Sequence, residues 1–234
     1  MWKYNFLFIV VLNALLFGCS QPDQKEQSEG SVASNISPSE KLLFDSLQFD
    51  VSILNEVRKF TNAAVEARKI IFHNYDLSDS KESAHSFKVI ALELPANEAR
   101  GIVLSLRQNL KQKGYSIYIS ESNFGHSPDV VSILKSADQF DILRVEQTDG
   151  VNHGIEHQDV LNKLIGWNKS KPFIIIGAGI DWVEAIFVST PAGMDEFAEE
   201  VYEFCPDVVD QGTGTVELLS QEMSGNNTLY LWWD

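Results

Sequence analysis

Hydrophobic positions from residue 40 onward are spaced alternately in some stretches and helically in others, which predicts a mixture of strands and helices. The clearest helical spacing covers residues 96–113, where Gly114 is expected to cap the helix. Further helices are predicted at 52–60, 128–136, 156–167, 191–204 and 216–223. Strands are predicted at 85–94, 115–119, 141–147, 172–176, 182–189 and 228–233, with another candidate in the apolar cluster at 70–72.

The order of these elements predicts an α+β fold in which mixed or antiparallel sheets are flanked by helices. Residues 85–120 read as a strand–helix–strand unit, and two β-α-β-type halves are one arrangement that the pattern allows. We therefore divide the folded part into an N-terminal α/β region at 40–140 and a C-terminal α+β domain at 141–234.

Residues 1–18 are typical of a bacterial signal peptide. Lys3 supplies a positive charge, and an apolar run follows from residue 6 to residue 17. This run is shorter than the roughly 20 residues that a membrane-spanning helix needs. It ends in Leu16-Phe17-Gly18-Cys19, which resembles the lipobox of bacterial lipoproteins. An ordinary secretory signal and a marginal membrane anchor are the alternatives.

The lipobox resemblance implies that Cys19 carries a thioether-linked diacylglycerol and, after cleavage before it, an N-terminal acyl chain such as palmitate. Two or three acyl chains hold a protein stably on a membrane, whereas one anchors only marginally. The expected membrane contact is therefore made through Cys19, and the expected location is the cell envelope. Ser20 does not match the aspartate that retains lipoproteins in the inner membrane, so the outer membrane is expected in a Gram-negative host.

Residues 19–39 connect this cysteine to the folded part. The segment contains only Val32 and Ile36 as large apolar residues, so its burial cannot offset the entropy of ordering it. We expect a disordered tether that holds the body roughly 25 Å from the lipid.

Composition supports a globular body and limits the classes of partner. Of the 234 residues, 44% are hydrophobic and 22% are charged, as in proteins with a buried core. The chain has 18 Lys and Arg against 33 Asp and Glu; Lys3 is the only charge before Cys19, so the mature chain carries 17 − 33 = −16. This charge disfavours nucleic acid as a partner, because neutralising phosphates requires basic residues. Two cysteines exclude a disulfide-rich scaffold.

Residues 141–234 resemble a bacterial family called domain of unknown function 4253. The matching motifs are Thr148-Asp149-Gly150, Gly154-Ile155, Trp167, Ile176-Gly177-Ala178-Gly179, Asp181-Trp182, the run from Phe197 to Asp207, Gln211-Gly212-Thr213-Gly214 and Leu231-Trp232-Trp233-Asp234. The Phe-Cys-Pro-Asp and Trp-Trp-Asp pieces are the most specific in combination. The resemblance implies continuity of fold, and it implies no reaction.

Two motifs suggest cofactor chemistry that their surroundings do not favour. The H-x-x-E-H pattern at His153–His157 belongs to inverted zincins, which need both histidines on one helix face. The helix here is expected to begin near Glu156, which leaves His153 outside it. Gly177-Ala178-Gly179 follows a strand like a dinucleotide-binding loop, but a strand comes next. We expect a hairpin with positive φ at its glycines, and no metal or other cofactor.

Cys205 has no partner within the chain once Cys19 is assigned to lipid. It lies at the end of a predicted helix beside Glu203 and Asp207, where negative potential raises the pKa of a thiol. A buried structural cysteine is therefore the preferred interpretation, and a catalytic nucleophile is the alternative.

Acidic and aromatic residues near the ends of the C-terminal elements form the candidate binding surface. Five carboxylates are candidates for a Ca²⁺ or Mg²⁺ cluster, namely Asp181, Glu184, Asp207, Asp210 and Asp234. A final strand that ends in Trp232-Trp233-Asp234 should expose one tryptophan. The predicted binding residues are Asp181, Trp182, Asp207, Asp210, Trp233 and Asp234, and 207–214 is a candidate ligand loop. The alternative is that these acidic side chains only solvate strand ends.

Together these features predict an envelope lipoprotein with a non-catalytic domain that binds a protein or a small ligand. A hydrolase that uses Cys205 and Asp207, or a carboxylate cluster, is a rival from another class. An immunity-type inhibitor is a third possibility, since an acidic surface is complementary to a basic toxin.

Overall fold

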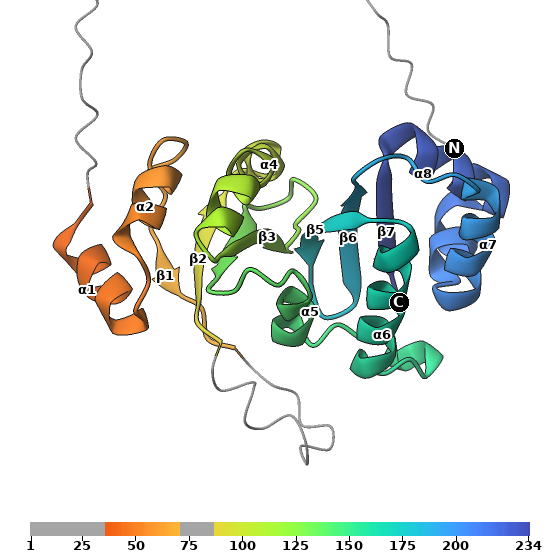
Figure 1. The fold of residues 1–234 in the computed structure, drawn as a ribbon, viewed down its shortest axis with the longest axis horizontal. Coiled ribbons are helices and arrows are strands. Elements are labelled where there is room, and N and C mark those ends of the chain that lie inside the picture. Colours follow the sequence, from red (N-terminus) through yellow and green to blue (C-terminus); the bar gives the residue numbers. More distant parts are fainter. Residues whose placement is uncertain (1–35, 71–86) are drawn as a thin grey trace, which may run out of the picture. The chain divides into compact units, whose positions relative to one another are not determined.

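The structure is a computed structural model that describes residues 36–70 and 87–234. The signal peptide, Cys19 and most of the predicted tether lie outside these residues. Within them, seven strands form one mixed sheet in the order β1-β2-β4-β3-β5-β6-β7 (Figure 1). The strands are β1 (Glu66–Ala67), β2 (Val89–Leu94), β3 (Ser116–Glu121), β4 (Asp129–Leu134), β5 (Phe173–Ala178), β6 (Trp182–Phe187) and β7 (Thr228–Trp232).

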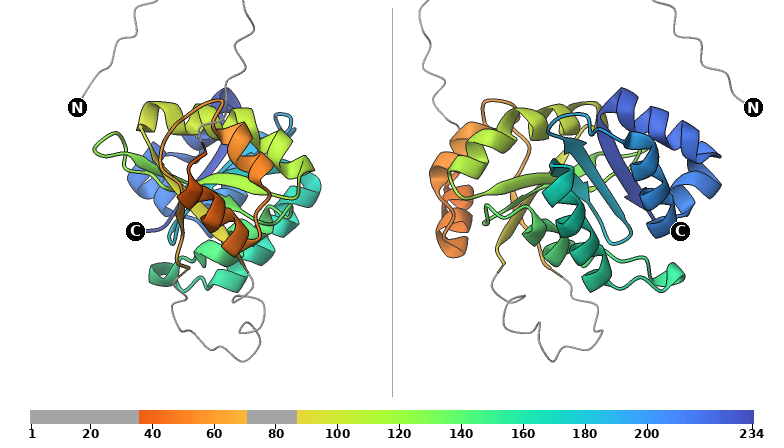
Figure 2. Two further views of the ribbon diagram at one scale, coloured as in Figure 1. Left: turned by 90° about the vertical axis from the view of Figure 1, so that its left-hand side faces the viewer. Right: turned by 45° about the vertical axis from the view of Figure 1, so that its right-hand side comes forward.

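Helices cover both faces of this sheet, with α4 on one face and α5 and α6 on the other (Figure 2). The helices are α1 (Pro38–Leu47), α2 (Val51–Val57), α4 (Ala96–Gln112), α5 (Phe140–Glu146), α6 (His157–Ser170), α7 (Met194–Phe204) and α8 (Val216–Asn226). A 3-10 turn covers Val151–His153, and a π-helical turn covers Val208–Thr213. The predicted α+β class, a mixed sheet flanked by helices, is confirmed.

The two halves of the sheet meet at one parallel pair, in which Ile119 of β3 lies opposite Gly177 of β5. All other neighbouring strands in the described sheet are antiparallel. In the N-terminal half, β4 lies between β2 and β3, so β2, α4 and β3 form a split β-α-β unit. The C-terminal half has no such unit, because β6 and β7 are antiparallel neighbours joined through α7 and α8.

Two elements differ in type from the prediction: one predicted helix is a strand, and one predicted strand is a helix. Residues 128–136 were expected to be helical but contain β4, where Val130 and Val131 belong to a β-branched run that pairs with strands on both sides. Residues 141–147 were expected to be a strand but contain α5. The adjacent residues Ile142 and Leu143 are both buried there, which a helix stripe allows and an alternating strand does not.

Helix α1 is an element that the hydrophobic pattern did not reveal. Ser37 and Glu40 form a reciprocal capping box around Pro38, so α1 begins within the last residues of the predicted tether. Helix α2 lies within the predicted 52–60 region except for its first residue, and α4 matches its predicted range closely.

Two hydrophobic clusters lie on opposite faces of the sheet because successive strand residues point in opposite directions. On β3, Ile117 and Ile119 enter the cluster under α1, α2 and α4, whereas the intervening Tyr118 enters the cluster under α5 to α8. The predicted regions 40–140 and 141–234 therefore share one continuous sheet.

The Gly-Ala-Gly segment is a hairpin as expected, but the reason for its glycines is different. Neither Gly177 nor Gly179 has a positive φ. Instead, the indole of Trp182 lies against both of them. A Cβ atom would be 2.7 Å from Cζ3 of Trp182 at Gly177 and 2.2 Å from its Nε1 at Gly179. These glycines therefore make room for a tryptophan ring on the sheet.

Replacing Gly179 with alanine should lower the free energy of unfolding by about 1–3 kcal/mol, because the indole of Trp182 must leave its position. Gly166→Ala on α6 is the matched control, since a Cβ there meets no atom within 4 Å. That change should raise stability by up to about 1 kcal/mol. Urea unfolding followed by circular dichroism measures both variants, and equal stabilities would contradict the packing role of Gly179.

Candidate functional site

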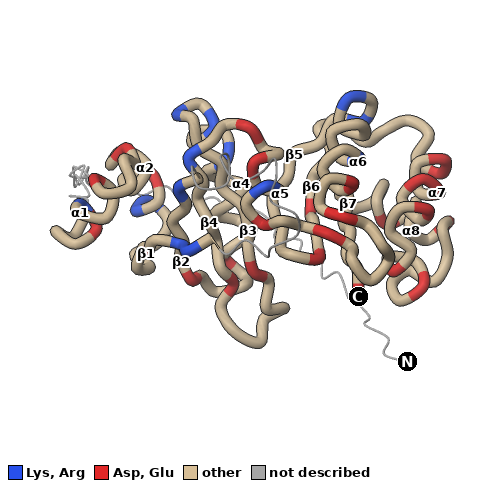
Figure 3. Tube along the Cα trace, turned by 90° about the horizontal axis from the view of Figure 1, so that it is seen from below, with Lys and Arg blue, Asp and Glu red and all other residues tan. Residues whose placement is uncertain are grey.

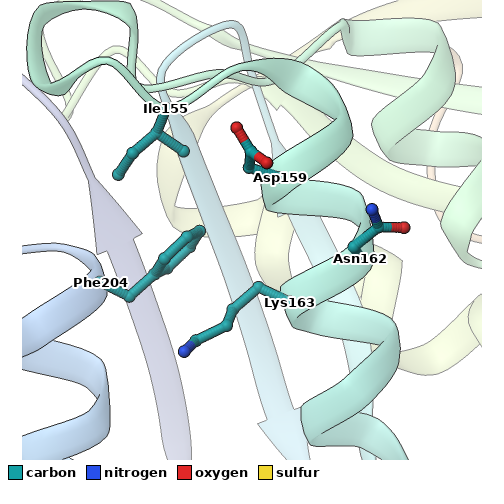
Figure 4. A pocket seen from close by; sticks show the side chains of 5 residues that line it. All are labelled: Ile155, Asp159, Asn162, Lys163 and Phe204. Carbon is teal, nitrogen blue, oxygen red and sulfur yellow. The ribbon is translucent and has the colours of Figure 1, made fainter.

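A shallow groove with a volume of about 510 Å³ lies between α6 and the C-terminal end of α7 (Figure 4). Its lining residues are Ile155, Asp159, Asn162, Lys163 and Phe204, and we call it the α6 groove. The volume lies in the range of small-molecule sites. In Figure 4 the Phe204 ring lies between the Asp159 carboxylate and the Lys163 ammonium group.

Lys163 is the most informative residue of the groove. Its Nζ lies 5.2 Å from the ring centroid of Trp167 and 5.3 Å from that of Phe204, within range of cation–π attraction. It makes no ion pair with any residue that the structure describes. Residues 130–234 contain 5 Lys and Arg and 18 Asp and Glu, a net charge of 5 − 18 = −13. Lys135 and Lys169 have no ion pair among the described residues either, so Lys163 differs from them in its position over two aromatic rings.

The charge is distributed unevenly along the described chain (Figure 3). Residues 36–70 and 87–129 contain 10 basic and 9 acidic residues, a net charge of +1. The acidic excess thus belongs to the C-terminal half, where α7 carries five carboxylates and no basic residue.

A hydrogen-bonded pair, His153 and Asp207, lies close in sequence to two groove residues, Ile155 and Phe204. His153 Nε2 donates to Oδ2 of Asp207 at 2.7 Å. Two further donors reach this buried carboxylate: Gln211 Nε2 at 3.0 Å from Oδ1, and the backbone amide of Asp234 at 2.9 Å from Oδ2. Asp207 therefore ties together the 3-10 turn, the π-helical turn and the C-terminal residue.

These hydrogen bonds determine the charge state of Asp207. Burial alone would raise the pKa of this carboxyl group, but the Asp234 amide, Gln211 and His153 together hold its pKa below the usual value. Asp207 is therefore ionised at neutral pH, and it serves as an anchor for three chain segments.

The three tryptophans near the predicted binding surface differ in burial. Trp233, one of the predicted binding residues, is only 3% exposed; its ring lies against Gly150, and its Nε1 donates to the carbonyl of Phe204 at 3.4 Å. Trp182 and Trp232 are half-buried. Trp233 is therefore a structural residue, and its flat ring needs Gly150 as a neighbour for the same reason that Trp182 needs Gly179.

The five predicted carboxylates do not converge. Glu184 pairs with Arg100, and Asp210 accepts a hydrogen bond from Tyr202, while Asp207 belongs to the His153 pair. Asp181 and Asp234 are exposed. Across residues 36–70 and 87–234, no group of three or more potential ligand side chains is placed to hold a metal ion. The described residues therefore do not form the candidate Ca²⁺ or Mg²⁺ cluster, because Glu184, Asp207 and Asp210 each have a different partner.

The histidines of the H-x-x-E-H motif also have separate partners. His153 lies in the 3-10 turn and bonds to Asp207, whereas His157 begins α6 and its Nδ1 lies 3.1 Å from the carbonyl oxygen of Thr148. Burial lowers the pKa of His157. The two rings do not share one helix face, as expected from the predicted start of the helix.

Cys205 is fully buried, and its Sγ donates to the carbonyl of Trp232 at 3.0 Å. Burial raises the pKa of this thiol to about 12, so it is not a thiolate at neutral pH. The burial expected for Cys205 is observed, and a buried thiol with a raised pKa does not favour a nucleophilic role.

Sequence reasoning missed the α6 groove. Its polar residues lie on one turn of α6, and Phe204 joins them only through the packing of α7 against α6. The signal available in the sequence was the spacing of Asp159 and Lys163, four residues apart on one helix face.

Comparison with known families agrees with the resemblance seen in the sequence. Residues 130–234 match the model of the family described as Domain of unknown function (DUF4253). The match begins at β4 and includes the α6 groove, the His153–Asp207 pair and Cys205. Searches among curated proteins and among solved structures found no match.

Substituting Asp207 with asparagine should lower the free energy of unfolding by about 2 kcal/mol at pH 7, since the amide cannot accept all three hydrogen bonds. Because the pKa of Asp207 is lowered by folding, its contribution is present at neutral pH and is lost as the pH falls below about 4. Denaturation curves of both proteins at pH 7 and pH 3 test this. A stability difference that is equally large at pH 3 would contradict the proposed role.

Proposed function

We propose that this protein is an envelope lipoprotein whose α+β body binds ligands and does not catalyse a reaction. Its α6 groove would take a small molecule or a peptide segment that presents a carboxylate beside an apolar group. The observation that carries this proposal is Lys163, a cation over two aromatic rings without a carboxylate partner among the described residues. A ligand carboxylate would supply that partner, while Phe204 and Ile155 would contact the apolar group.

The arrangement near the groove supports binding rather than hydrolysis. A nucleophile and a general base must lie within hydrogen-bond reach of each other. The Cys205 thiol is buried, and the Asp207 carboxylate already accepts three hydrogen bonds. Neither side chain is therefore available for such chemistry. His153 is held as a hydrogen-bond donor to Asp207, and no nucleophilic side chain in the described part of the chain forms a hydrogen bond with it.

The exposed face of α7 supports a second candidate, an inhibitor of a basic toxin. Asp195, Glu196, Glu199 and Glu203 are exposed there, and the helix contains no basic residue. Electrostatic association of this kind would weaken steeply with salt concentration. Salt-independent capture of its partner would argue against this candidate.

The groove proposal is tested with two ligands that differ only in charge, N-acetylphenylalanine and its amide. The mature chain with Cys19→Ser should bind the acid about tenfold more tightly than the amide, a difference of about 1.4 kcal/mol. Fluorescence of Trp167, which lies under Lys163, reports binding. The variant Lys163→Met should lose the preference for the acid.

Lys169→Met is the matched control because Lys169 is an exposed lysine on the same helix. It should keep the preference of the parent chain. Equal affinities for the acid and the amide in the parent chain would contradict the assignment of the groove.

The lipid anchor is tested independently of the groove. None of the helices within residues 36–70 and 87–234 is both long and apolar enough to cross a membrane. With Cys19 lipidated, the protein should sediment with membranes and incorporate an alkyne-labelled fatty acid. Cys19→Ser should abolish both results, whereas Cys205→Ser should leave lipid incorporation unchanged. Membrane sedimentation of Cys19→Ser would contradict the proposal.

A further inference from the structure

The exposed face of β6 and β7 carries an aromatic surface that the proposed function does not use. Register places Glu184 opposite Tyr230 and Trp182 opposite Trp232. The ring of Trp182 packs on the face that α4 covers, whereas the ring of Trp232, at the end of the edge strand, packs against the cluster on the other face. The alternate residues, such as Val183 and Leu231, are buried in the cluster under α6, α7 and α8. We call the face formed by Trp182, Glu184 and Tyr230 the aromatic platform.

Among the described helices, only α4 reaches the platform, through the ion pair between Arg100 and Glu184. The rings of Trp182 and Tyr230 have centroids 6.2 Å apart and planes inclined by 28°. The Trp182 indole rests on Gly177 and Gly179, so one side of the ring is covered by backbone. The ring is half-buried, since it also packs against the hydrophobic cluster that α4 covers.

The polar atoms of the platform's aromatic side chains have no hydrogen-bond partner among the described residues. The polar atoms of several other tryptophans and tyrosines do have one. Trp167 and Trp233 donate from Nε1, and Tyr118 and Tyr202 donate from their hydroxyl groups. Tyr115 accepts the backbone amide of Asp50.

In contrast, Nε1 of Trp182, Nε1 of Trp232 and Oη of Tyr230 have no hydrogen-bond partner in the described part of the chain. Every buried side-chain nitrogen or oxygen there has a partner, so these three atoms must reach solvent.

The charges near the platform limit what can bind. Asp181 is exposed, and Glu184 contributes a second carboxylate, while Arg100 is occupied by Glu184. Burial, together with the Glu184 and Asp181 carboxylates, raises the pKa of Tyr230 to about 12, so its hydroxyl group is a donor at neutral pH. Aromatic sheet faces also bind single-stranded nucleic acid, but those sites need basic residues along the phosphate backbone. The acidic C-terminal half excludes that partner on electrostatic grounds.

We infer that the aromatic platform is a binding site for an uncharged glycan chain. The apolar face of a pyranose ring fits the flat rings of Trp182 and Tyr230. Sugar hydroxyl groups would accept from the indole and phenol donors and donate to the carboxylates of Asp181 and Glu184.

The experiment uses the mature chain with Cys19→Ser and three probes, chitotetraose, cellotetraose and maltotetraose. At least one of them should shift the indole N–H signal of Trp182 in a proton–nitrogen correlation spectrum, while those of Trp167 and Trp233 stay in place. Trp182→Ala should weaken binding about tenfold, equivalent to about 1.4 kcal/mol. Tyr230→Phe, which removes one hydroxyl group and keeps the ring, should weaken it about threefold, within the net value of one hydrogen bond.

Phe124→Ala is the matched control, since this ring is 78% exposed on the turn between β3 and β4. It should leave the affinity unchanged, as should Lys163→Met in the α6 groove. The proposal is overturned if none of the tetrasaccharides shifts the Trp182 indole signal at about 5 mM, where a millimolar dissociation constant would give strong occupancy. It is also overturned if Lys163→Met, and not Trp182→Ala, removes binding, because the glycan would then bind in the α6 groove.

Discussion

The close approach of an indole ring to glycine backbone is the constraint on which much of the C-terminal half depends. Gly177 pairs with Ile119 across the one parallel junction of the described sheet, and it also underlies the ring of Trp182. A side chain at this position would push Trp182 away at the place where the two halves of the sheet join. The same arrangement recurs where Trp233 lies against Gly150. Glycine here provides space, and not an unusual backbone angle.

The second constraint is the buried carboxylate of Asp207, which connects parts of the chain that are distant in sequence. A buried charge is tolerated only when donors surround it, and His153, Gln211 and the amide of Asp234 do so. Its position explains why the Phe-Cys-Pro-Asp and Trp-Trp-Asp pieces occur together. The aspartate of the first piece accepts from the backbone of the last residue of the second. Both belong to the scaffold beside the α6 groove.

The sequence predicted the fold class and most C-terminal elements, because long amphipathic helices such as α6 and α7 have clear periods. It failed at β4 and α5, where short apolar runs fit either type of element and pairing with neighbouring strands decides between them. Among site residues, the burial of Cys205 followed from its helix-end position. The exposure of Trp233 could not be judged, since its cover comes from Gly150 and Phe204, far away in the sequence. The α6 groove could not be predicted for the same reason, since Phe204 reaches it from α7.

The tryptophans of the described chain fall into two groups. Trp167 and Trp233 are structural residues, whereas the indole N–H groups of Trp182 and Trp232 are available for binding. Hydrogen exchange of the indole N–H groups tests this division directly. Trp167 and Trp233 should exchange slowly, because their Nε1 atoms donate to Glu200 and to the carbonyl of Phe204. Trp182 and Trp232 should exchange at rates close to those of free indole. Slow exchange at Trp182 and Trp232, or fast exchange at Trp233, would contradict the account.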